Sequence, residues 1–298
     1  MRDSPLDLSP DCTAAVLTQA LPYIQRFSGA TVVVKCGGST LGATDASNEG
    51  LARFAADVVL MHSVGIRPVV VHGGGPQIGD MMQRLGLQPR FVDGLRITDA
   101  ETLDIARMVL VGQVNREIVS AINDHGPLAV GVSGEDAGLI TARADRPELG
   151  FVGTVASVNT AIIGRLLDEN LIPVVSTIGA DTAGQALNIN ADAVAGTLAG
   201  ALGAAKAVFL TNVEGLYADP SDPNSLISAT TASDLEEMIV AGAIGGGMIP
   251  KVQAAVHAVR HGVVSAHIVN GTTAHVLLLE LFTDAGVGTM ISEGQQNS

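Results

Sequence analysis

The chain has 298 residues, of which 47% are hydrophobic, so it can bury a large core in one domain or two lobes. A formal net charge of −14 argues against nucleic acid or an anionic membrane as a partner. Cys12 and Cys36 are too few for a disulfide framework or a cysteine metal cluster. No signal-peptide h-region and no apolar run of about 20 residues is present. We therefore expect a cytoplasmic protein that does not bind membranes.

Buried strands alternate with helices along the chain. Ser9 and Pro10 predict the N-cap and first turn of an added N-terminal helix, which Pro22 should kink or divide. Thr98 and Glu101 predict a capping box for a long helix. The segment 128–156 predicts short strands or a hairpin. The other helices are expected near 46–64, 76–85, 157–170, 191–203, 232–242 and 250–262, and the main strands at 32–35, 69–71, 172–179, 207–211 and 266–269.

This alternation predicts an α/β fold. The core is Val, Ile, Leu and Ala, with no Trp, which suits a mainly parallel sheet covered by helices on both faces. In such a sheet, ligands bind at the carboxyl ends of the strands. Several predicted strands end there in glycine.

The first of these strand ends is VVVKCGGST, from Val32 to Thr40. Lys35 stands where the apolar run stops, and a buried cation is costly unless an anion meets it. Gly37 and Gly38 predict a tight turn whose N–H groups could bind phosphate. Cys36 has an apolar flank and no functional assignment.

A second stretch, VVVHGGGPQI from Val69, repeats the pattern with Gly73, Gly74 and Gly75. One glycine turn alone is more simply a connection between a strand and a helix, but two alike favour an anion site. The patterns GxxxxGK[ST] and strand-linked GxGxxG are absent, which excludes the standard phosphate-loop and dinucleotide sites.

Lysine is rare: there are only three, and the other two are Lys206 and Lys251. Lys251 follows a glycine cluster and Pro250, in a first helical turn, where a lone cation is disfavoured. It is either a solvated surface lysine or half of an anion site, whereas Lys206 is expected to be structural.

Polar residues recur in NINAD. Asn190 is either an N-cap or a member of a polar face with Asn188, and Asp192 is either a first-turn acid or a group that holds two lysines. Arg96 is either a carboxylate or phosphate clamp or a surface arginine. No His/Cys cluster has metal-ligand spacing. Two lysines and two glycine turns suit phosphoryl transfer without a protein nucleophile.

Six motifs in order resemble the amino acid kinase family: VVVKCGGS, VVVHGGGPQI, FVDGLRITD, LNINADAVA, LTNVEGLYAD and GGGMIPKV. The resemblance implies an open αβα sandwich with a mainly parallel central sheet and an N-terminal extension helix. It also implies that ATP with Mg²⁺ phosphorylates the side-chain carboxylate of N-acetyl-L-glutamate in arginine biosynthesis. The implied parts are an oligomerisation helix over 1–28, an N-terminal lobe over 29–185 for acetylglutamate binding and dimerisation, and a C-terminal lobe over 186–298 for ATP binding. The two lobes are expected to share one sheet.

The resemblance assigns roles to residues. It implies that Lys35 and Lys251 stabilise the moving phosphoryl group and that Asp192 orients both lysines. The implied acetylglutamate-binding residues are Gly74, Gly75, Arg96, Asn188 and Asn190. The implied ATP-binding residues are Gly37, Gly38, Asn212, Val213, Glu214, Gly215, Leu216, Tyr217, Ala243, Ile244 and Gly245, with no metal ligand from a protein side chain.

The added helix and the C-terminal segment resemble the longer members that L-arginine inhibits. For this chain they imply an effector site with Tyr23, Glu280 and Gly288, and a homo-oligomer, either a dimer or a hexamer of three dimers. Two departures from the family pattern are Asn212 and Asn270-Gly271-Thr272, where Asp and Asp-Gly-Arg are common. The alternatives are a kinase of carbamate, aspartate or a nucleotide, or a sensing module without catalysis.

Overall fold

The computed structural model describes residues 9–37, 47–92, 94–219, 221–283 and 286–294. An eight-stranded sheet forms its centre, in the order β14-β16-β15-β11-β1-β2-β8-β5, and all neighbouring pairs are parallel except β15 and β16. The sheet thus joins strands from both halves of the chain. These strands are β1 Thr31–Cys36, β2 Arg67–His72, β5 Ala129–Ser133, β8 Ile172–Ser176, β11 Lys206–Thr211, β14 Ala229–Thr231, β15 Ser265–Asn270 and β16 Gly288–Ser292.

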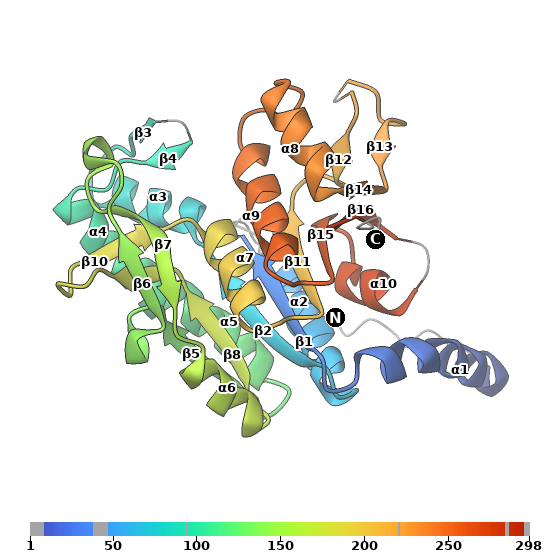
Figure 1. The fold of residues 1–298 in the computed structure, drawn as a ribbon. Helices are drawn as coiled ribbons and strands as arrows, with labels where there is room; N and C mark the ends of the chain where they lie inside the picture. Colours follow the sequence, from blue (N-terminus) through green and yellow to red (C-terminus); the bar gives the residue numbers. More distant parts are fainter. Residues whose placement is uncertain (1–8, 38–46, 93, 220, 284–285, 295–298) are drawn as a thin grey trace.

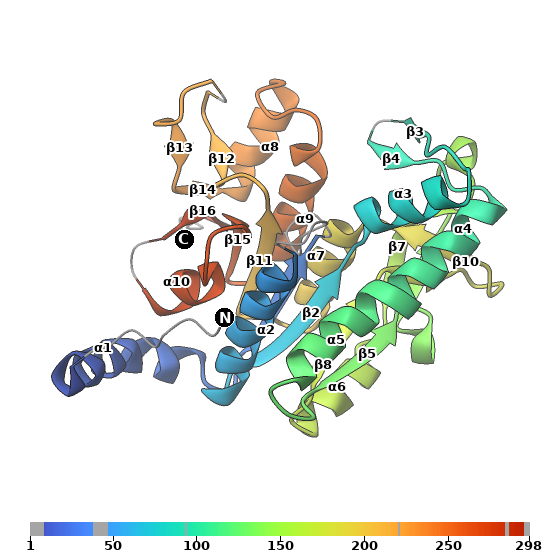
Figure 2. The same ribbon diagram turned by 180° about the vertical axis from the view of Figure 1, so that it is seen from behind.

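Helices cover both faces of the sheet, as the composition predicts (Figures 1 and 2). One core cluster packs beneath α2 Ser47–Ser63, α5 Asn115–Asn123 and α10 Val276–Phe282. The other packs beneath α6 Ala161–Asp168, α7 Ala191–Ala201, α8 Ala232–Val240 and α9 Met248–Arg260. Alternation along β1 places Val32 and Val34 in the first cluster and Val33 in the second. No helix of the described ranges is long and apolar enough to cross a membrane.

Smaller units lie beyond the carboxyl ends of the strands. A closed four-stranded barrel combines β6 Ile140–Arg143, β7 Val152–Val158, β9 Ile178–Ala180 and β10 Ala186–Ile189. Two short ribbons pair β3 Phe91–Val92 with β4 Leu95–Arg96, and β12 Leu216–Tyr217 with β13 Leu226–Ile227. The segment 128–156 therefore contributes one strand to the main sheet and the antiparallel pair β6–β7 to the barrel.

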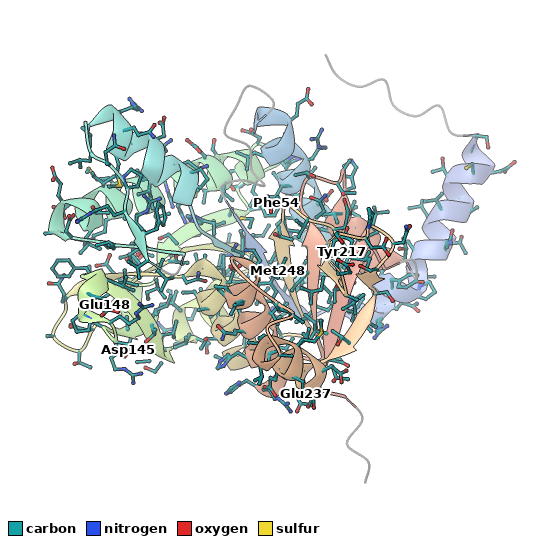
Figure 3. The ribbon with its side chains drawn as sticks, turned by 90° about the horizontal axis from the view of Figure 1, so that it is seen from above. Phe54, Asp145, Glu148, Tyr217, Glu237 and Met248 are labelled. Atoms are coloured by element: carbon teal, nitrogen blue, oxygen red, sulfur yellow. The ribbon has the colours of Figure 1, made fainter. Side chains whose placement is uncertain are left out.

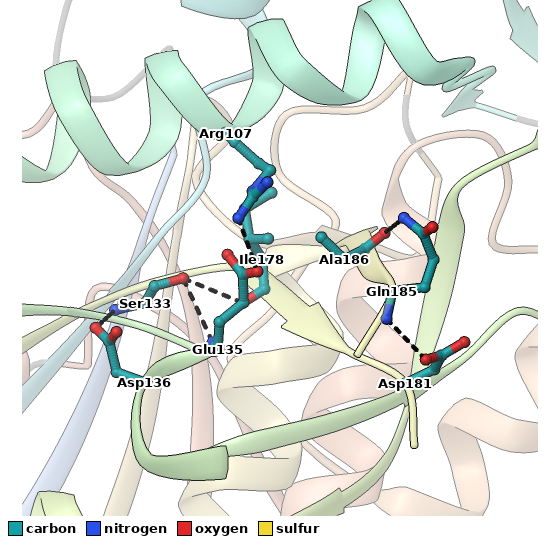
Figure 4. Close-up of polar contacts among 8 residues, drawn as sticks. All are labelled: Arg107, Ser133, Glu135, Asp136, Ile178, Asp181, Gln185 and Ala186. Carbon is teal, nitrogen blue, oxygen red and sulfur yellow. Dashed lines mark hydrogen bonds and ion pairs between the residues drawn. The ribbon is translucent and has the colours of Figure 1, made fainter. Parts of the chain in front are cut away.

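The turn that leads from β5 into the barrel is fastened to a helix (Figure 4). Asp136 accepts a hydrogen bond at 2.7 Å from the Ser133 N–H, and Glu135 forms an ion pair at 3.1 Å with Arg107. Arg107 ends α4 Ala100–Arg107. The barrel is thus tied to the helical layer that also flanks the second glycine turn.

One local prediction was wrong. The N-cap of the long helix is Asp99, whose carboxylate accepts from the Thr102 N–H at 2.9 Å, whereas the Thr98 hydroxyl donates to the Arg96 carbonyl. That helix runs as α4, a π-helical segment over Met108–Val114, and α5. Ser9 caps α1 Pro10–Phe27 as expected. Of the two alternatives for Pro22, a division of this helix is excluded, because α1 continues through that residue.

Candidate active site

Lys35 lies near the carboxyl end of β1, two residues after Val33 and therefore on the face covered by α7 and α9. Its side chain is only 7% exposed, so its charge needs a partner within the protein. Asp192, in the first turn of α7, supplies it: Lys35 Nζ lies 2.8 Å from Asp192 Oδ1. The cation that the sequence places at the end of an apolar strand is thus paired with a buried carboxylate.

Asp192 also holds the second lysine. Lys251 Nζ donates a hydrogen bond at 3.0 Å to Asp192 Oδ2, so one carboxylate bridges two ammonium groups. Burial by itself would raise the pKa of Asp192, but the two lysine charges and their hydrogen bonds outweigh it and lower that pKa. Burial and the charge of Lys35 lower the pKa of Lys251. The cluster carries a net positive charge, as an anion-binding centre requires.

Close packing of α7 and α9 brings these groups together. A Cβ at Gly196 of α7 would lie 2.4 Å from the carbonyl oxygen of Ala254 in α9, so only glycine permits this approach. Asn190 caps α7 by accepting from the N–H groups of Asp192 and Ala193 at 2.8 and 3.1 Å. The interpretation of Asn190 as an N-cap is therefore confirmed.

The second glycine turn opens α3 Gly75–Arg84 beside this cluster. Gly73 N–H donates to the carbonyl of Cys36 at 3.2 Å, which joins the two glycine turns. A Cβ at Gly74 would lie 2.7 Å from Leu110, so the turn packs tightly on the π-helical segment. In the described part of the chain, the N–H groups of Gly74 and Gly75 meet no acceptor, which leaves both for a ligand. Gly38 lies outside the described residues.

A cavity of about 290 Å³ gathers most of the predicted residues of the first half. Arg96 enters it from β4 and is held by a hydrogen bond at 2.8 Å to the Gly75 carbonyl and by the Phe91 ring, whose centroid is 4.8 Å from the guanidinium carbon. Burial lowers the pKa of Arg96. Predicted and unpredicted residues share the lining: Lys35, Gly37, Gly74, Gly75, Arg96, Asn188, Asn190 and Asp192 were predicted, whereas Phe91, Leu110, Val152 and Thr177 were not.

Phe91 is a residue that sequence reasoning missed. It sits five residues before Arg96 within a motif already noted, and the Asp-Gly turn signal inside FVDGLRITD could have predicted the ribbon that places it opposite Arg96. Leu110 and Thr177 carry no comparable signal in the sequence. Leu110 reaches the cavity because of the π-helical segment, and Thr177 because it lies between β8 of the main sheet and β9 of the barrel.

The predicted nucleotide residues lie elsewhere in the second half. Asn212–Tyr217 follow the carboxyl end of β11, and Ala243–Gly245 join α8 to α9. Neither stretch lines the cavity of about 290 Å³ or its larger neighbour of about 580 Å³, which lies between β7 and α9. Asp145 lines that neighbour, as do Ile249 and Pro250 in the first turn of α9; Figure 3 labels Asp145 and Met248, the residue that begins α9. Asn270 donates to Glu214 at 2.8 Å, a bond that the aspartate common in relatives could not donate.

One of the three predicted effector residues, Glu280, belongs to a buried charge cluster that does not line the active-site cavity. Glu280 of α10 accepts from Lys206 Nζ at 3.2 Å and contacts His267 Nδ1 at 2.7 Å. Burial would raise the pKa of Glu280, but His267 and Lys206 together lower it. Tyr23 lies in α1, whose last residue, Phe27, has its ring centroid 5.4 Å from Lys206 Nζ. Gly288 begins β16.

Comparison with known proteins agrees with this architecture. The model of the amino acid kinase family matches residues 30–270. This chain belongs to the amino acid kinase family. Acetylglutamate kinase of Marinobacter nauticus is 52% identical over 293 residues, covering 94% of this chain and 98% of that protein.

Among solved structures, N-acetylglutamate synthase from Neisseria gonorrhoeae with coenzyme A and N-acetyl-glutamate has a TM-score of 0.82 at 27% identity. The match covers 95% of this chain and 64% of that longer protein. The same synthase with coenzyme A and L-arginine gives a TM-score of 0.79 at 28% identity, over 94% of this chain and 65% of the synthase. The family fold therefore extends over nearly the whole chain.

We expect Asp192→Asn to destabilise the folded protein by about 3–5 kcal/mol at pH 7, because it leaves one buried and one partly buried lysine without a counter-charge. A lowered carboxyl pKa stabilises the fold above the ordinary value of 3.8, and this contribution is lost as the pH falls through the folded-state pKa. Urea unfolding of both proteins at pH 7, 5 and 3 should show the difference shrink at the lowest pH. Asp104→Asn, at an exposed site on α4, is the matched control. A difference that stays constant down to pH 3 would contradict the assignment.

Proposed function

We propose that this chain catalyses the ATP-dependent phosphorylation of the side-chain carboxylate of N-acetyl-L-glutamate, a step of arginine biosynthesis. The observation that carries the proposal is the placement of Lys35 and Lys251 on the two oxygens of one buried carboxylate, next to a cavity with free N–H donors. The 52% identity to an acetylglutamate kinase over almost the whole chain supports the choice of substrate.

The chemistry is a direct in-line transfer. An oxygen of the substrate carboxylate attacks the γ-phosphorus of ATP, the new O–P bond forms, the bond from that phosphorus to the β,γ-bridging oxygen breaks, and ADP leaves. The negative charge spreads over the equatorial oxygens of the moving group, so catalysis rests on positioning and on cations rather than on a protein nucleophile. Lys35 and Lys251 supply those cations. Asp192 keeps both ammonium groups at fixed positions before the substrates arrive.

The substrates are assigned to different halves of the chain. We assign acetylglutamate to the cavity of about 290 Å³, most of whose lining comes from 29–185, where Arg96 suits a carboxylate. Asn188, which lines the same cavity from the start of 186–298, suits a carboxylate or an amide. ATP is assigned to 186–298, along Asn212–Tyr217 and Ala243–Gly245, with its terminal phosphate toward Lys251. Gly37, Gly74 and Gly75 would donate N–H groups to the phosphoryl group and the substrate.

Magnesium is expected to arrive with ATP, held by phosphate oxygens and water. Asp192, the carboxylate at the cavity, is already engaged by both lysines and does not suit a metal ion. In the described ranges no group of three or more His, Cys, Asp or Glu side chains could hold one. The charge stabilisation assigned to this chain's own residues therefore rests on the lysines and the glycine N–H groups.

The direct test measures ATP-dependent release of ADP with each candidate acceptor, and hydroxylamine traps the acylphosphate product where the acceptor is a carboxylate. Acetylglutamate should be phosphorylated far faster than carbamate, aspartate or a nucleoside monophosphate. Omission of ATP is the control for each acid. If acetylglutamate reacted no faster than the other acids, the choice of substrate would be wrong; if no acid reacted, the protein would be a sensing module rather than a kinase.

In this assay Lys251→Ala should lower kcat by roughly a hundredfold to a thousandfold, the usual cost of losing one group that stabilises transition-state charge. KM for acetylglutamate should change much less, because Arg96 and Asn188 are untouched. Arg84→Ala removes an exposed cation from the last turn of α3 and serves as the control. Near-normal turnover of the Lys251 variant would rule out its role.

We further propose that L-arginine inhibits the enzyme and binds where α1 meets α10. The buried carboxylate of Glu280 suits a guanidinium group, with Tyr23 and Gly288 as further contacts, and Lys206 and His267 supply its present partners. The synthase that shares this fold has been solved with L-arginine.

On α1, the exposed side chains of Val16, Leu17 and Leu21 give the helix an apolar surface that suits pairing with a second copy. We propose that this pairing links dimers into a hexamer.

Deletion of residues 1–27 should therefore yield dimers by light scattering and weaken inhibition by arginine in the acylphosphate assay. The double variant Leu17→Asp/Leu21→Asp should also yield dimers but keep Phe27 against Lys206. Basal activity should survive in both, because α1 contributes nothing to the active-site cavity. A deletion variant that still forms the larger oligomer would contradict the role of α1.

A further inference from the structure

His72, the last residue of β2, is completely buried, and the proposed transfer uses none of its atoms. It is the only polar side chain of its strand besides Arg67, and it directly precedes the second glycine turn. A buried imidazole is costly unless its two nitrogens are hydrogen-bonded. Its partners therefore indicate what the residue does.

Both ring nitrogens have partners. Nδ1 lies 3.1 Å from the carbonyl oxygen of Gly73, which can only accept, so Nδ1 carries the proton. Nε2 lies 3.1 Å from Nδ2 of Asn115, which donates to it. The same Asn115 amide donates its second hydrogen at 2.9 Å to the Val174 carbonyl, and its oxygen accepts from the Arg116 guanidinium. Every polar atom of the pair thus has one consistent role.

The charge state agrees with this pattern. Burial lowers the pKa of His72 to about 4; the charge of Arg116 lowers it as well, and the bond to Gly73 opposes both. His72 is therefore neutral at pH 7, as a single Nδ1–H donor requires. The cysteine opposite it in the neighbouring strand, Cys36, has a thiol whose pKa burial raises to about 12.

The π-helical segment sets the position of Asn115, which begins α5 directly after it. Leu110 and Val114 of that segment stand against Gly74, where an added Cβ would lie 2.7 and 3.2 Å from them. Three residues of one continuous helix thus meet the glycine turn or the histidine that precedes it. A local π-helical register often marks a functional site, and here it aligns all three contacts.

Peptide planarity turns the Gly73 contact into a constraint on the active site. The carbonyl of Gly73 and the N–H of Gly74 belong to one trans peptide and point in opposite directions. When His72 holds that carbonyl, the direction of the Gly74 N–H is fixed. The next carbonyl, of Gly74, accepts from the Ile78 N–H at 2.9 Å, which fixes the Gly75 N–H in the same manner.

We propose that His72 and Asn115 are positioning residues for the phosphoryl transfer: through the Gly73 carbonyl they aim the N–H groups of the glycine turn at the reacting group. The inference rests on the proposed function, since it concerns the donors of that same site. The competing interpretation is that the pair only stabilises the fold.

Two substitutions of His72 separate these interpretations. In His72→Asn the side-chain amide can occupy the position of Nδ1 and still donate to Gly73, whereas in His72→Gln it reaches the position of Nε2 and keeps only the contact with Asn115. Both bury one amide at the same place. We expect similar urea midpoints, kcat within about threefold of wild type for His72→Asn, and kcat about tenfold to a hundredfold lower for His72→Gln, with smaller changes in KM.

Equal kcat values for the two variants, or kcat losses that follow their losses of stability, would overturn the proposal. The comparison uses whichever acid the wild type phosphorylates best, so a wrong substrate appears as a wild-type preference and a wrong positioning role appears as the ratio between variants. If a variant does not fold, imidazole ¹⁵N spectra of the wild-type protein at pH 7 decide. The neutral Nδ1–H form supports the proposal, and the Nε2–H form or the imidazolium overturns it.

Discussion

The ion-pair cluster around Asp192 is the interaction on which the rest of the site depends. One carboxylate, nearly excluded from water, touches two ammonium groups that come from a strand and a helix far apart in sequence. Alone, either lysine would be a buried or partly buried cation, and each would repel the other. Asp192 offsets both costs and leaves a net positive charge facing the cavity. A phosphoryl group with more than one negative charge is the natural complement of that arrangement.

Backbone geometry provides the second half of the anion site. Gly196 lets α7 and α9 approach so closely that Asp192 in the first turn of α7 contacts Lys251 in the first turn of α9. Gly74 lets the second glycine turn pack against the π-helical segment. His72 and Arg96 donate hydrogen bonds to the carbonyl groups of Gly73 and Gly75, which fixes the orientation of this turn. The N–H groups of Gly74 and Gly75 meet no acceptor in the described part of the chain and are available to a ligand. Lysines and peptide donors then act on the same charge from fixed positions, which is what electrostatic preorganisation requires.

All three lysines of the chain meet buried carboxylates, although they serve two different places. Lys35 and Lys251 share Asp192, and Lys206 pairs with Glu280 under the last turn of α1. Most of the arginine ion pairs in the described ranges, by contrast, involve side chains that are one third or more exposed. The sequence predicted a structural role for Lys206. Lys206 begins β11 and contacts Phe27 of α1 and Glu280 of α10, so it joins these elements in the region proposed for arginine.

The sequence by itself determined the alternation of strands and helices, the two glycine turns and the N-cap at Ser9, because local propensity carries that information. It also offered an N-cap as one alternative for Asn190 and an anion site as one alternative for Lys251, beside the scarce lysine at Lys35. It offered Asp192 either as an ordinary first-turn acid or as the group that holds two lysines, and residue patterns alone could not decide between these roles, since three segments must converge before the carboxylate has a partner. Nor could the sequence show that Asp99 rather than Thr98 is the N-cap of α4, that a π-helical segment precedes Asn115, or that His72 holds the Gly73 carbonyl. Those features arise from tertiary packing, where the burial of a polar group, not its sequence neighbours, decides which hydrogen bonds must form.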